Sequence, residues 1–404
     1  MAQGDRARLG FSVARLARLD AALEAAIAAR HLPGAVLLIA RRGQLAHAVA
    51  AGTLRPDGAT PMPQDAVFRI YSMTKPLTSI AALMLMEEGR LQLADAVVDH
   101  LPEFGAPPVS VPTGSGFALV AARRPMTLHD LLTHSSGLTY GERSANAPVR
   151  AAHLSAGLDV NPRAMAPARF VDALAHAPLA HHPGSVWDYG FSTDLLGLIV
   201  ERVAGCTLGA FLAARVFEPL GMRDSVFHLR ADQTARLAEP FPVDPLTGDA
   251  LRAPSQVFDA LDPPAMHSGG AGALSTADDY MRVVRMLAGG GVFAGRRLLS
   301  PASVRLMTSD HLGTRVATPL SPGEAALNSP GYGFGLGVAV RLADGLASVP
   351  GSAGDYFWSG TAGTTFWVDP RLDLAVVFMA QAPGAMRLRL RRMIRQLVYA
   401  AVVD

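Results

Sequence analysis

The stretch Ser72-Met73-Thr74-Lys75 contains the only lysine of this 404-residue chain, and every other one of its 36 basic residues is an arginine. An arginine guanidinium keeps its proton in proteins, whereas a lysine amine can lose its proton when its surroundings lower its pKa. Residues three apart share one face of a helix, so the Lys75 amine can reach the Ser72 hydroxyl. Such an amine can activate a serine as a nucleophile. The alternative, that an arginine-rich genome left one lysine by chance, does not account for this spacing.

The residues around this stretch predict a strand followed by a helix. The brief, mostly apolar segment 68–71 is expected to be a strand, and Ser72 is expected to open a helix that runs to Glu88. Pro76 then lies in the first helical turn, where a missing N–H is tolerated. This arrangement would place Ser72 near the positive end of the helix dipole, which favours a developing anion.

Strand patterns lie near both ends of the chain, and helical patterns dominate between them. Apolar periodicity predicts helices at 13–30, 127–132, 167–177, 193–203, 208–216, 279–287 and 385–401, and strands at 35–40, 45–51, 332–342, 363–368 and 372–380. This order favours an α/β (α+β) fold with one sheet built from both termini and a helical insertion. We expect a discontinuous α/β domain of residues 1–80 and 285–404, a mostly helical domain of residues 81–284, and an active site in the cleft between them.

Composition narrows the class of protein. Half of the residues are hydrophobic and 17% are charged, as in a globular enzyme with a large core, and a formal net charge of +2 is too small to indicate a nucleic-acid or membrane partner. No signal peptide or run of 18 apolar residues is visible, so a cytoplasmic location is expected. The single cysteine, Cys206, excludes an intramolecular disulfide and is expected to be buried. No metal or other cofactor is expected.

The last predicted helix is amphipathic and rich in arginine. A basic amphipathic helix can mark a membrane or nucleic-acid surface. Packing of the apolar face on the sheet, with the arginines in water, is the favoured alternative. The arginines are Arg387, Arg389, Arg391, Arg392 and Arg395.

Other nucleophile motifs are absent from the chain. The G-x-S-x-G elbow of α/β-hydrolases does not occur. No histidine has a partner serine by motif, and His134, which follows a predicted helix, is expected to stabilise a turn. Serine–lysine chemistry is therefore the catalytic hypothesis that remains.

Four further blocks resemble one known group of enzymes. The Ser72-x-x-Lys75 pair resembles the nucleophile motif of serine β-lactamases and penicillin-binding proteins. The other blocks follow in the order and spacing of their class C-like branch, and they are Leu131–Leu138, Pro183-Gly184-Ser185-Val186-Trp187-Asp188-Tyr189, Gly269–Asp279 and Trp358-Ser359-Gly360. The resemblance covers about residues 16–401 and is greatest to the family VIII carboxylesterases. It implies a β-lactamase-like fold, with an antiparallel sheet flanked by helices.

The resemblance also implies the catalytic roles. Ser72 matches the nucleophile, and Lys75 matches its activating partner. Tyr189 matches the tyrosine of the family's Tyr-x-Asn element, which is the candidate general base. The oxyanion hole would be formed by the backbone N–H groups of Ser72 and Thr361.

The substrate-binding residues implied by the resemblance include two departures from the β-lactamase pattern. Phe191 stands where the Tyr-x-Asn element has asparagine, and Trp358 replaces the lysine of the Lys-Thr-Gly motif, here Trp358-Ser359-Gly360. Losing an amide and a cation weakens binding of an anionic antibiotic far more than binding of a neutral ester. The changed residues therefore favour an esterase.

The sequence thus predicts a serine carboxylesterase that hydrolyses short-chain neutral carboxylic esters through an acyl-enzyme on Ser72. One alternative is an acyltransferase that passes the acyl group to a second alcohol, and another is a β-lactamase. A non-catalytic scaffold is a further alternative, but a scaffold does not need Ser72, Lys75 and Tyr189 together. The expected partner is a small-molecule ester.

Overall fold

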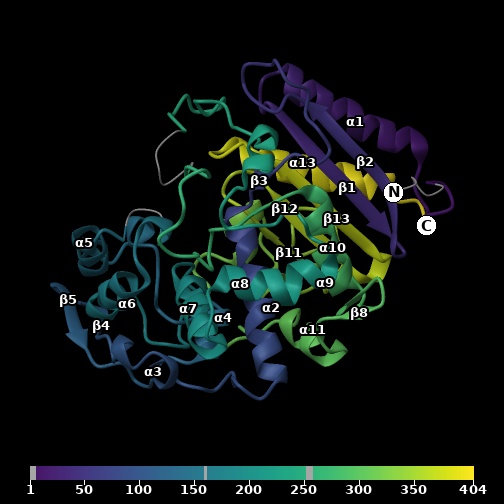
Figure 1. Cartoon of the computed structure of the whole chain (residues 1–404). Coiled ribbons are helices and arrows are strands. Elements are labelled where there is room, and N and C mark those ends of the chain that lie inside the picture. Colours follow the sequence, from purple (N-terminus) through teal and green to yellow (C-terminus); the bar gives the residue numbers. More distant parts are fainter. Residues whose placement is uncertain (1–5, 159–161, 252–257) are drawn as a thin grey trace.

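The computed structural model describes residues 6–158, 162–251 and 258–404, and its centre is a seven-stranded sheet (Figure 1). Every neighbouring pair of strands in this sheet whose register is resolved runs antiparallel. The strands in spatial order are β2 (Gln44–Gly52), β1 (Gly34–Arg41), β13 (Leu374–Ala380), β12 (Thr365–Asp369), β11 (Tyr356–Ser359), β10 (Ala339–Arg341) and β9 (Tyr332–Phe334). The sheet is therefore built from both ends of the chain, as predicted.

Strand β1 connects the strands from the N-terminal part of the chain to those from the C-terminal part. It pairs with β13 along its whole length, with Leu37 opposite Phe378, and all eight of its residues are buried. Its other edge pairs with β2 through the hairpin at Arg42 and Gly43, both of which have positive φ. Positive φ at both central residues is the geometry that suits a two-residue hairpin between twisted strands. Arg42 and Gly43 therefore connect β1 and β2 in a tight turn.

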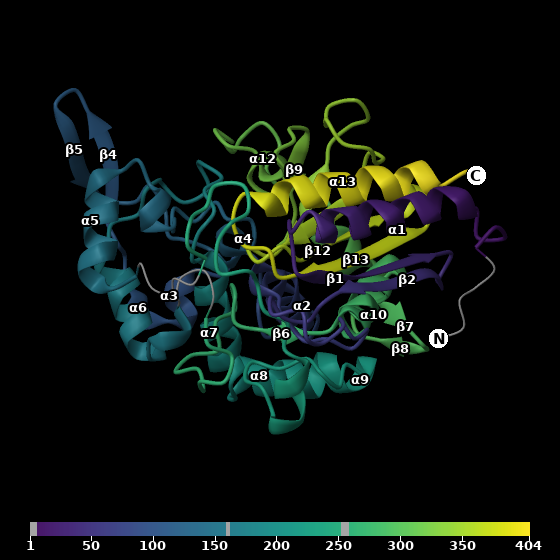
Figure 2. The ribbon, with the colours of Figure 1, turned by 90° about the horizontal axis from the view of Figure 1, so that it is seen from above.

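Helices cover both faces of the sheet (Figure 2). The first helix, α1 (Val13–Ala28), and the last, α13 (Met386–Ala401), lie side by side on one face, and α10 (Ala277–Ala288) packs against β1 and β13 on the other. The expected domain boundary between residues 284 and 285 falls inside α10. A division before Ala277 would leave this helix with the sheet on which it packs, and the domain limits stay a prediction.

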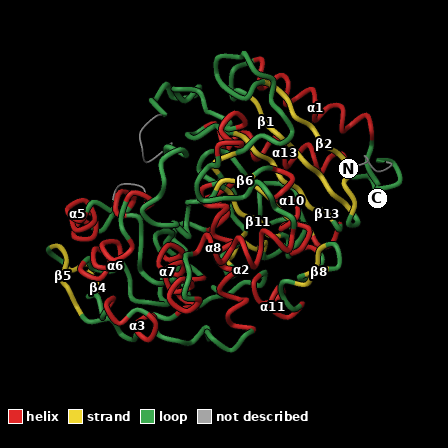
Figure 3. Tube along the Cα trace, viewed as in Figure 1, coloured by secondary structure: helices red, strands yellow, loops and turns green. Residues whose placement is uncertain are grey.

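The middle of the chain, from α2 to the residues before α10, is mostly helical and lies to one side of the sheet (Figure 3). Its helix α2 (Thr74–Glu87) is almost entirely buried and contacts α7 and α8. The other helices are α3 (Val97–His100), α4 (Leu128–Leu132), α5 (Ala147–Ala156), α6 (Pro167–His176), α7 (Ser192–Ala204), α8 (Leu208–Leu212), α9 (Glu218–Leu220), α11 (Pro301–Met307) and α12 (Pro322–Leu327). Three small pairs of strands accompany them, namely β3 (Phe68–Arg69) with β6 (Leu274–Ser275), β4 (Val109–Thr113) with β5 (Gly116–Val120), and β7 (Val292–Phe293) with β8 (Arg296–Arg297).

The arginines of α13 were all expected to point into water, and this expectation is wrong for two of them. Its apolar face packs on the sheet, but Arg391 and Arg395 are also buried. The Arg395 guanidinium donates to Asp355 at 2.6 Å, and Arg341 donates to the same carboxylate oxygen at 2.7 Å. A buried carboxylate needs such paired cations, so Asp355 draws Arg395 inward.

The expectation of a buried Cys206 is wrong. The thiol follows Gly205, which has a positive φ of 73° at the end of α7, and it is exposed. Among the described residues no single helix has the length and apolar character of a membrane span. One pair of segments, Ser192–Ala204 and Leu208–Leu220, passes that test jointly by length and composition, with a bend of 75° between them.

Candidate active site

Ser72 lies in a tight turn that leads into α2. Strand β3 is shorter than predicted, because residues 71–73 form a turn of 3₁₀ helix and the α-helix itself begins at Thr74. Tyr71 has a φ of 44°, which is uncommon for a residue with a side chain. Backbone strain of this kind often occurs at functional sites. Here it turns the chain directly before Ser72, which is half-buried at the N-terminal end of the helix.

Lys75 is fully buried beside Ser72. Its ammonium nitrogen lies 3.5 Å from Ser72 Oγ, 3.3 Å from the Tyr140 hydroxyl oxygen and 2.9 Å from the Gly270 carbonyl oxygen. An ammonium group has three hydrogens to donate, and these three acceptors use all of them. The spacing of three residues thus brings the amine and the hydroxyl together, as the sequence indicated.

The surroundings of Lys75 favour its charged form. Burial, the largest single influence, acts against the ammonium, but the negative charge that Tyr140, Tyr189 and Asp194 can carry outweighs it and raises the pKa of Lys75 above its ordinary value. A lysine with a raised pKa is an ammonium at neutral pH. The resting site therefore holds a buried cation next to Ser72.

Two tyrosines flank this cation. The Tyr189 ring centroid lies 4.5 Å from the Lys75 nitrogen, and the Trp358 indole N–H donates to the Tyr189 hydroxyl oxygen at 3.2 Å. Tyr140 accepts from Lys75, and its ring meets the Tyr189 ring edge to face. Burial raises the pKa of Tyr140, and the charge of Lys75 opposes this rise. The Tyr189 hydroxyl oxygen thus accepts a hydrogen bond from the indole, and the Tyr189 ring lies beside the buried ammonium.

Tyr140 was not among the residues predicted for the site. Its position two residues after the block Leu131–Leu138 was the only signal in the sequence. That block forms the end of α4 and the turn after it, and the turn brings Tyr140 to Lys75.

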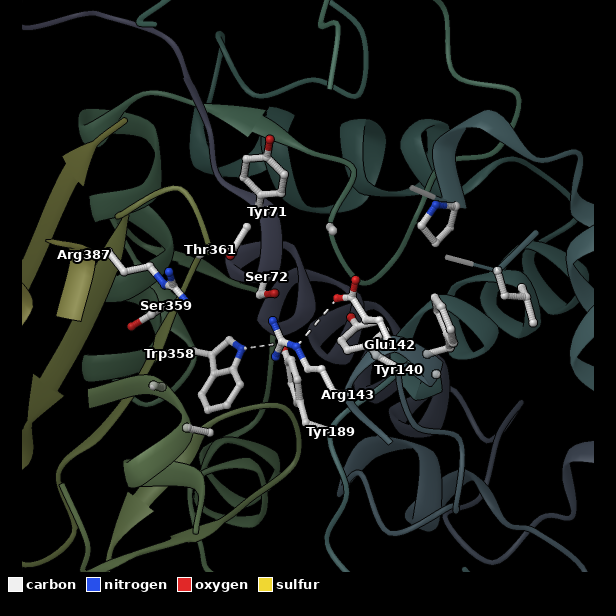
Figure 4. A pocket seen from close by; sticks show the side chains of 18 of the residues that line it. Tyr71, Ser72, Tyr140, Glu142, Arg143, Tyr189, Trp358, Ser359, Thr361 and Arg387 are labelled. Atoms are coloured by element: carbon white, nitrogen blue, oxygen red, sulfur yellow. Dashed lines mark hydrogen bonds and ion pairs between the residues drawn. The ribbon is translucent and has the colours of Figure 1, made fainter. Parts of the chain in front are cut away.

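These side chains open into one pocket (Figure 4). All of the predicted substrate-binding residues and Thr361 line it together with Ser72. The lining residues are Tyr71, Ser72, Tyr140, Gly141, Glu142, Arg143, Leu158, Pro162, Tyr189, Phe191, Ala271, Ala325, Ala326, Trp358, Ser359, Gly360, Thr361, Arg387 and Arg391. Figure 4 shows the Trp358 indole and Tyr189 pointing toward each other in the pocket that also contains Ser72.

Gly360 allows the end of β11 to approach the nucleophile turn. A Cβ at this position would overlap the Ile70 carbonyl oxygen, so only glycine permits this contact of two backbones. The Gly360 N–H donates to the Thr364 carbonyl at 2.9 Å and fixes the turn after the strand. Thr361 is thereby held in the pocket wall with Ser72.

Phe191 and Trp358 form apolar walls of the pocket, and each is only 2% exposed. Phe191 meets the Tyr140 ring edge to face with the ring centroids 4.8 Å apart. Trp358 packs in the same way on Phe334 at 5.1 Å. Phe191 thus supports Tyr140, and little of the Phe191 surface remains for a substrate.

The cations of this pocket come from places that the sequence did not indicate. Arg387 and Arg391 of α13 line one wall, and Arg143, 3.8 Å from Glu142, lines the opposite side. Burial, assisted by the charge of Arg387, lowers the pKa of Arg391 well below its ordinary value. The Arg391 guanidinium donates to backbone carbonyls, including that of Gly360, and so supports the turn beside Ser72.

The histidine nearest the site has a structural role, as predicted. His134 is buried with a φ of 55°, and it bonds the Thr193 hydroxyl at 3.2 Å and the Gly190 N–H at 3.4 Å. Burial, followed by the charge of Lys75, lowers its pKa well below the ordinary value, so it is neutral. It holds the chain that carries Tyr189. In the described part of the chain, no group of three or more His, Cys, Asp or Glu side chains is placed to hold a metal ion.

Known proteins share both the sequence pattern and the fold. The beta-lactamase family profile matches residues 19–400. Esterase EstB of Burkholderia gladioli is 34% identical over 382 residues, which cover 90% of this chain and 89% of EstB. The structure of EstCE1, a hydrolase with promiscuous acyltransferase activity, has a TM-score of 0.78 and 29% identity, with 96% of this chain and 100% of that chain covered. Simvastatin synthase (LovD) from Aspergillus terreus has a TM-score of 0.80 and 27% identity, with 96% and 99% covered.

The chain belongs to the beta-lactamase family. Within this family it is similar to the esterase EstB, to EstCE1 and to simvastatin synthase, which confirms the predicted resemblance to the family VIII carboxylesterases and the β-lactamase-like fold.

Proposed function

We propose that this protein is a serine carboxylesterase that hydrolyses short-chain neutral carboxylic esters through an acyl-enzyme on Ser72. The observation that carries the proposal is the contact of the buried Lys75 ammonium with Ser72 Oγ, in a pocket that also contains Tyr189 and Thr361. Similarity to a protein named as an esterase supports the same chemistry. The first test is a panel of nitrophenyl esters of increasing acyl length.

In the proposed acylation step, Tyr189 acts as a phenolate and takes the proton of Ser72. Ser72 Oγ then forms a bond to the ester carbonyl carbon, and the carbonyl oxygen becomes an oxyanion that the N–H groups of Ser72 and Thr361 stabilise. When the tetrahedral intermediate collapses, the bond to the alcohol breaks and Tyr189 returns the proton to the leaving oxygen. Lys75 lowers the energy of the phenolate throughout.

Deacylation repeats these steps with water as the nucleophile, and this step separates the esterase from the acyltransferase alternative. A second alcohol in place of water would give a new ester. The promiscuous acyltransferase activity of EstCE1 favours keeping this alternative open. Adding increasing amounts of a small alcohol to the ester assay and measuring the new ester against the free acid distinguishes the two outcomes.

We expect Tyr189→Phe and Tyr140→Phe to differ. Removing a general base lowers kcat by about 10² to 10⁴-fold, so Tyr189→Phe should fall in that range. Tyr140→Phe removes one acceptor of Lys75 but keeps the ring against Phe191, and a much smaller loss is expected. The check is kcat for a butyrate ester with both variants. The assignment is wrong if Tyr140→Phe is the more damaging change.

Specificity should favour esters over β-lactams. Because Trp358 and Phe191 supply neither a cation nor an amide, kcat/KM for a butyrate ester should exceed that for a cephalosporin by about 10² to 10⁴-fold. Arg387 and Arg391 can attract an anion, so weak cephalosporin hydrolysis is compatible with the proposal. Measuring both substrates on one preparation tests it, and preference for the cephalosporin would contradict it. Trp358→Lys should shift the ratio toward the anionic substrate.

Three expectations from the sequence accompany this proposal as predictions. They are a cytoplasmic location, a small-molecule ester as the partner, and no nucleic-acid or membrane partner. Cell fractionation tests the first, and the ester panel tests the second. The third predicts that neither DNA nor lipid vesicles retain the protein at physiological salt.

A further inference from the structure

Asp194 is a buried carboxylate behind the proposed catalytic residues. It lies in the first turn of α7 and is 2% exposed. Its Oδ1 accepts two hydrogen bonds, one from Ser268 Oγ at 2.5 Å and one from the Gly270 N–H at 3.1 Å. Within the ranges that the structure describes, no arginine, lysine or histidine lies within ion-pair distance of it. A buried carboxylate without a nearby cation costs several kcal/mol, so a compensating charge is needed.

Gly270 connects this carboxylate to Lys75. Its N–H points to Asp194, and its carbonyl oxygen accepts the shortest of the three hydrogen bonds that Lys75 donates, at 2.9 Å. A Cβ on Gly270 would overlap the Asp194 carboxylate, so the close approach requires glycine. The turn that begins at Ser268 is therefore held from one side by Asp194 and holds Lys75 from the other.

The charges that face Lys75 come from each element packed around it. The turn after α4 carries neutral His134 and leads to Tyr140, the segment before α7 carries Tyr189, and α7 carries Asp194. Asp194 is the one carboxylate among them. Burial raises the pKa of Asp194 and Lys75 opposes this rise, while Asp194 helps to raise the pKa of Lys75. Each group stabilises the charge of the other.

We propose that Asp194 is a positioning residue that fixes Lys75 through Gly270 and keeps the Lys75 amine charged. Lys75 then acts as a permanent cation for Tyr189 rather than as a base. The structural part of this inference is independent of the substrate, and only its kinetic part rests on the proposed esterase function.

The single lysine makes the inference directly measurable. Protein grown with [¹³Cε]-lysine gives one side-chain NMR signal, which reports the protonation of Lys75. In the native protein this signal should keep its ammonium position up to at least the ordinary lysine pKa of about 10.4. In Asp194→Asn, which keeps the side-chain shape and one acceptor oxygen, the midpoint should fall by about 1 to 3 pH units, the effect of one nearby opposite charge.

Asp279→Asn is a matched control. Asp279 is also buried in the first turn of a helix and accepts from a backbone N–H (Asp224, 2.7 Å) and from a serine hydroxyl (Ser225, 3.0 Å). It has no part in the Lys75 surroundings, so this variant should leave the lysine signal unchanged. An equal shift in both variants would overturn the inference, as would no shift in Asp194→Asn. A native midpoint below the ordinary lysine pKa would also overturn it, even if Asp194→Asn does not fold.

Ser268→Ala separates position from charge. It leaves the carboxylate in place but removes the hydroxyl that orients it. The lysine midpoint should stay near the native value, while kcat for a butyrate ester falls severalfold with KM unchanged. Asp194→Asn should lower kcat by at least as much as Ser268→Ala, because it weakens the acceptor that fixes Gly270 and, through the Gly270 carbonyl, Lys75. A loss confined to KM would contradict a positioning role. If the native protein hydrolysed no ester while the NMR shifts appeared, the proposed function would fail and this inference would stand.

Discussion

Ser72→Ala should abolish ester hydrolysis and leave the fold intact. The hydroxyl is the only group of the protein that bonds to the acyl carbon in the proposed mechanism, so a loss of at least about 10³-fold in kcat is expected. Ser72 is half-buried and its Oγ contacts Lys75, so an alanine removes few packing contacts. The check is turnover of a butyrate ester together with mass spectrometry of the protein, in which the native enzyme should gain the mass of one acyl group and the variant none.

Ser79→Ala is the matched control for this prediction. Ser79 lies on α2, the helix that follows the Ser72 turn. It is buried, and its hydroxyl has no hydrogen-bond partner among the described residues. Its replacement should preserve activity and should not destabilise the protein, because it removes an unsatisfied polar group. Retention of more than a few per cent of native turnover by folded Ser72→Ala would show that another residue is the nucleophile.

Lys75→Arg should be nearly as damaging as Lys75→Ala, with a loss of kcat on the order of 10³-fold for both. The native amine fits a fully enclosed space and donates to three acceptors that surround it. A planar guanidinium is larger and presents its donors in a fixed fork, so it cannot reproduce this arrangement. Ester turnover of both variants, with thermal unfolding to confirm folding, measures the effect.

The structure changes the reason for this expectation. At the level of sequence, lysine was distinguished from arginine by the ability of the lysine amine to lose its proton, but the raised pKa of Lys75 means that the native amine is charged. Geometry is then the cause. Lys75→Met, which keeps the length and removes the charge, should be as inactive as Lys75→Ala. If Lys75→Arg worked nearly as well as the native enzyme, Lys75 would serve only as a positive charge without a geometric requirement.

Patterns of local periodicity were sufficient to predict most of the fold. Strands such as β1 and β13 are continuous apolar runs, and the turn at Arg42 and Gly43 has the residues that a tight hairpin needs. The segment 332–342 was predicted as one strand and is two, β9 and β10, because Gly335 and Gly337 turn the chain between them. The shortest elements, such as β3, were the least predictable, since two paired residues leave almost no pattern.

The sequence-based prediction of exposed arginines on α13 was wrong where a residue far away in the sequence binds the side chain. Arginines on an amphipathic helix normally face water, but Asp355 on the sheet binds Arg395, and the carbonyls beside the nucleophile bind Arg391. These partners are 40 and 31 residues away in the sequence. The sequence of the helix alone therefore does not predict that Arg391 and Arg395 are buried.

By itself, the sequence determined the contact between Ser72 and Lys75, because that contact depends only on the local conformation of the chain. Ser72 and Lys75 are three residues apart on one turn of chain, so their proximity follows from the shape of a helix. Tertiary structure alone decided what surrounds them. Tyr140 and Gly270 are 65 and 195 residues from Lys75, and Asp194 is 76 residues from Gly270. Such contacts exist because buried charges must be satisfied wherever the packed elements bring donors and acceptors together, and no pattern of neighbouring residues encodes that meeting.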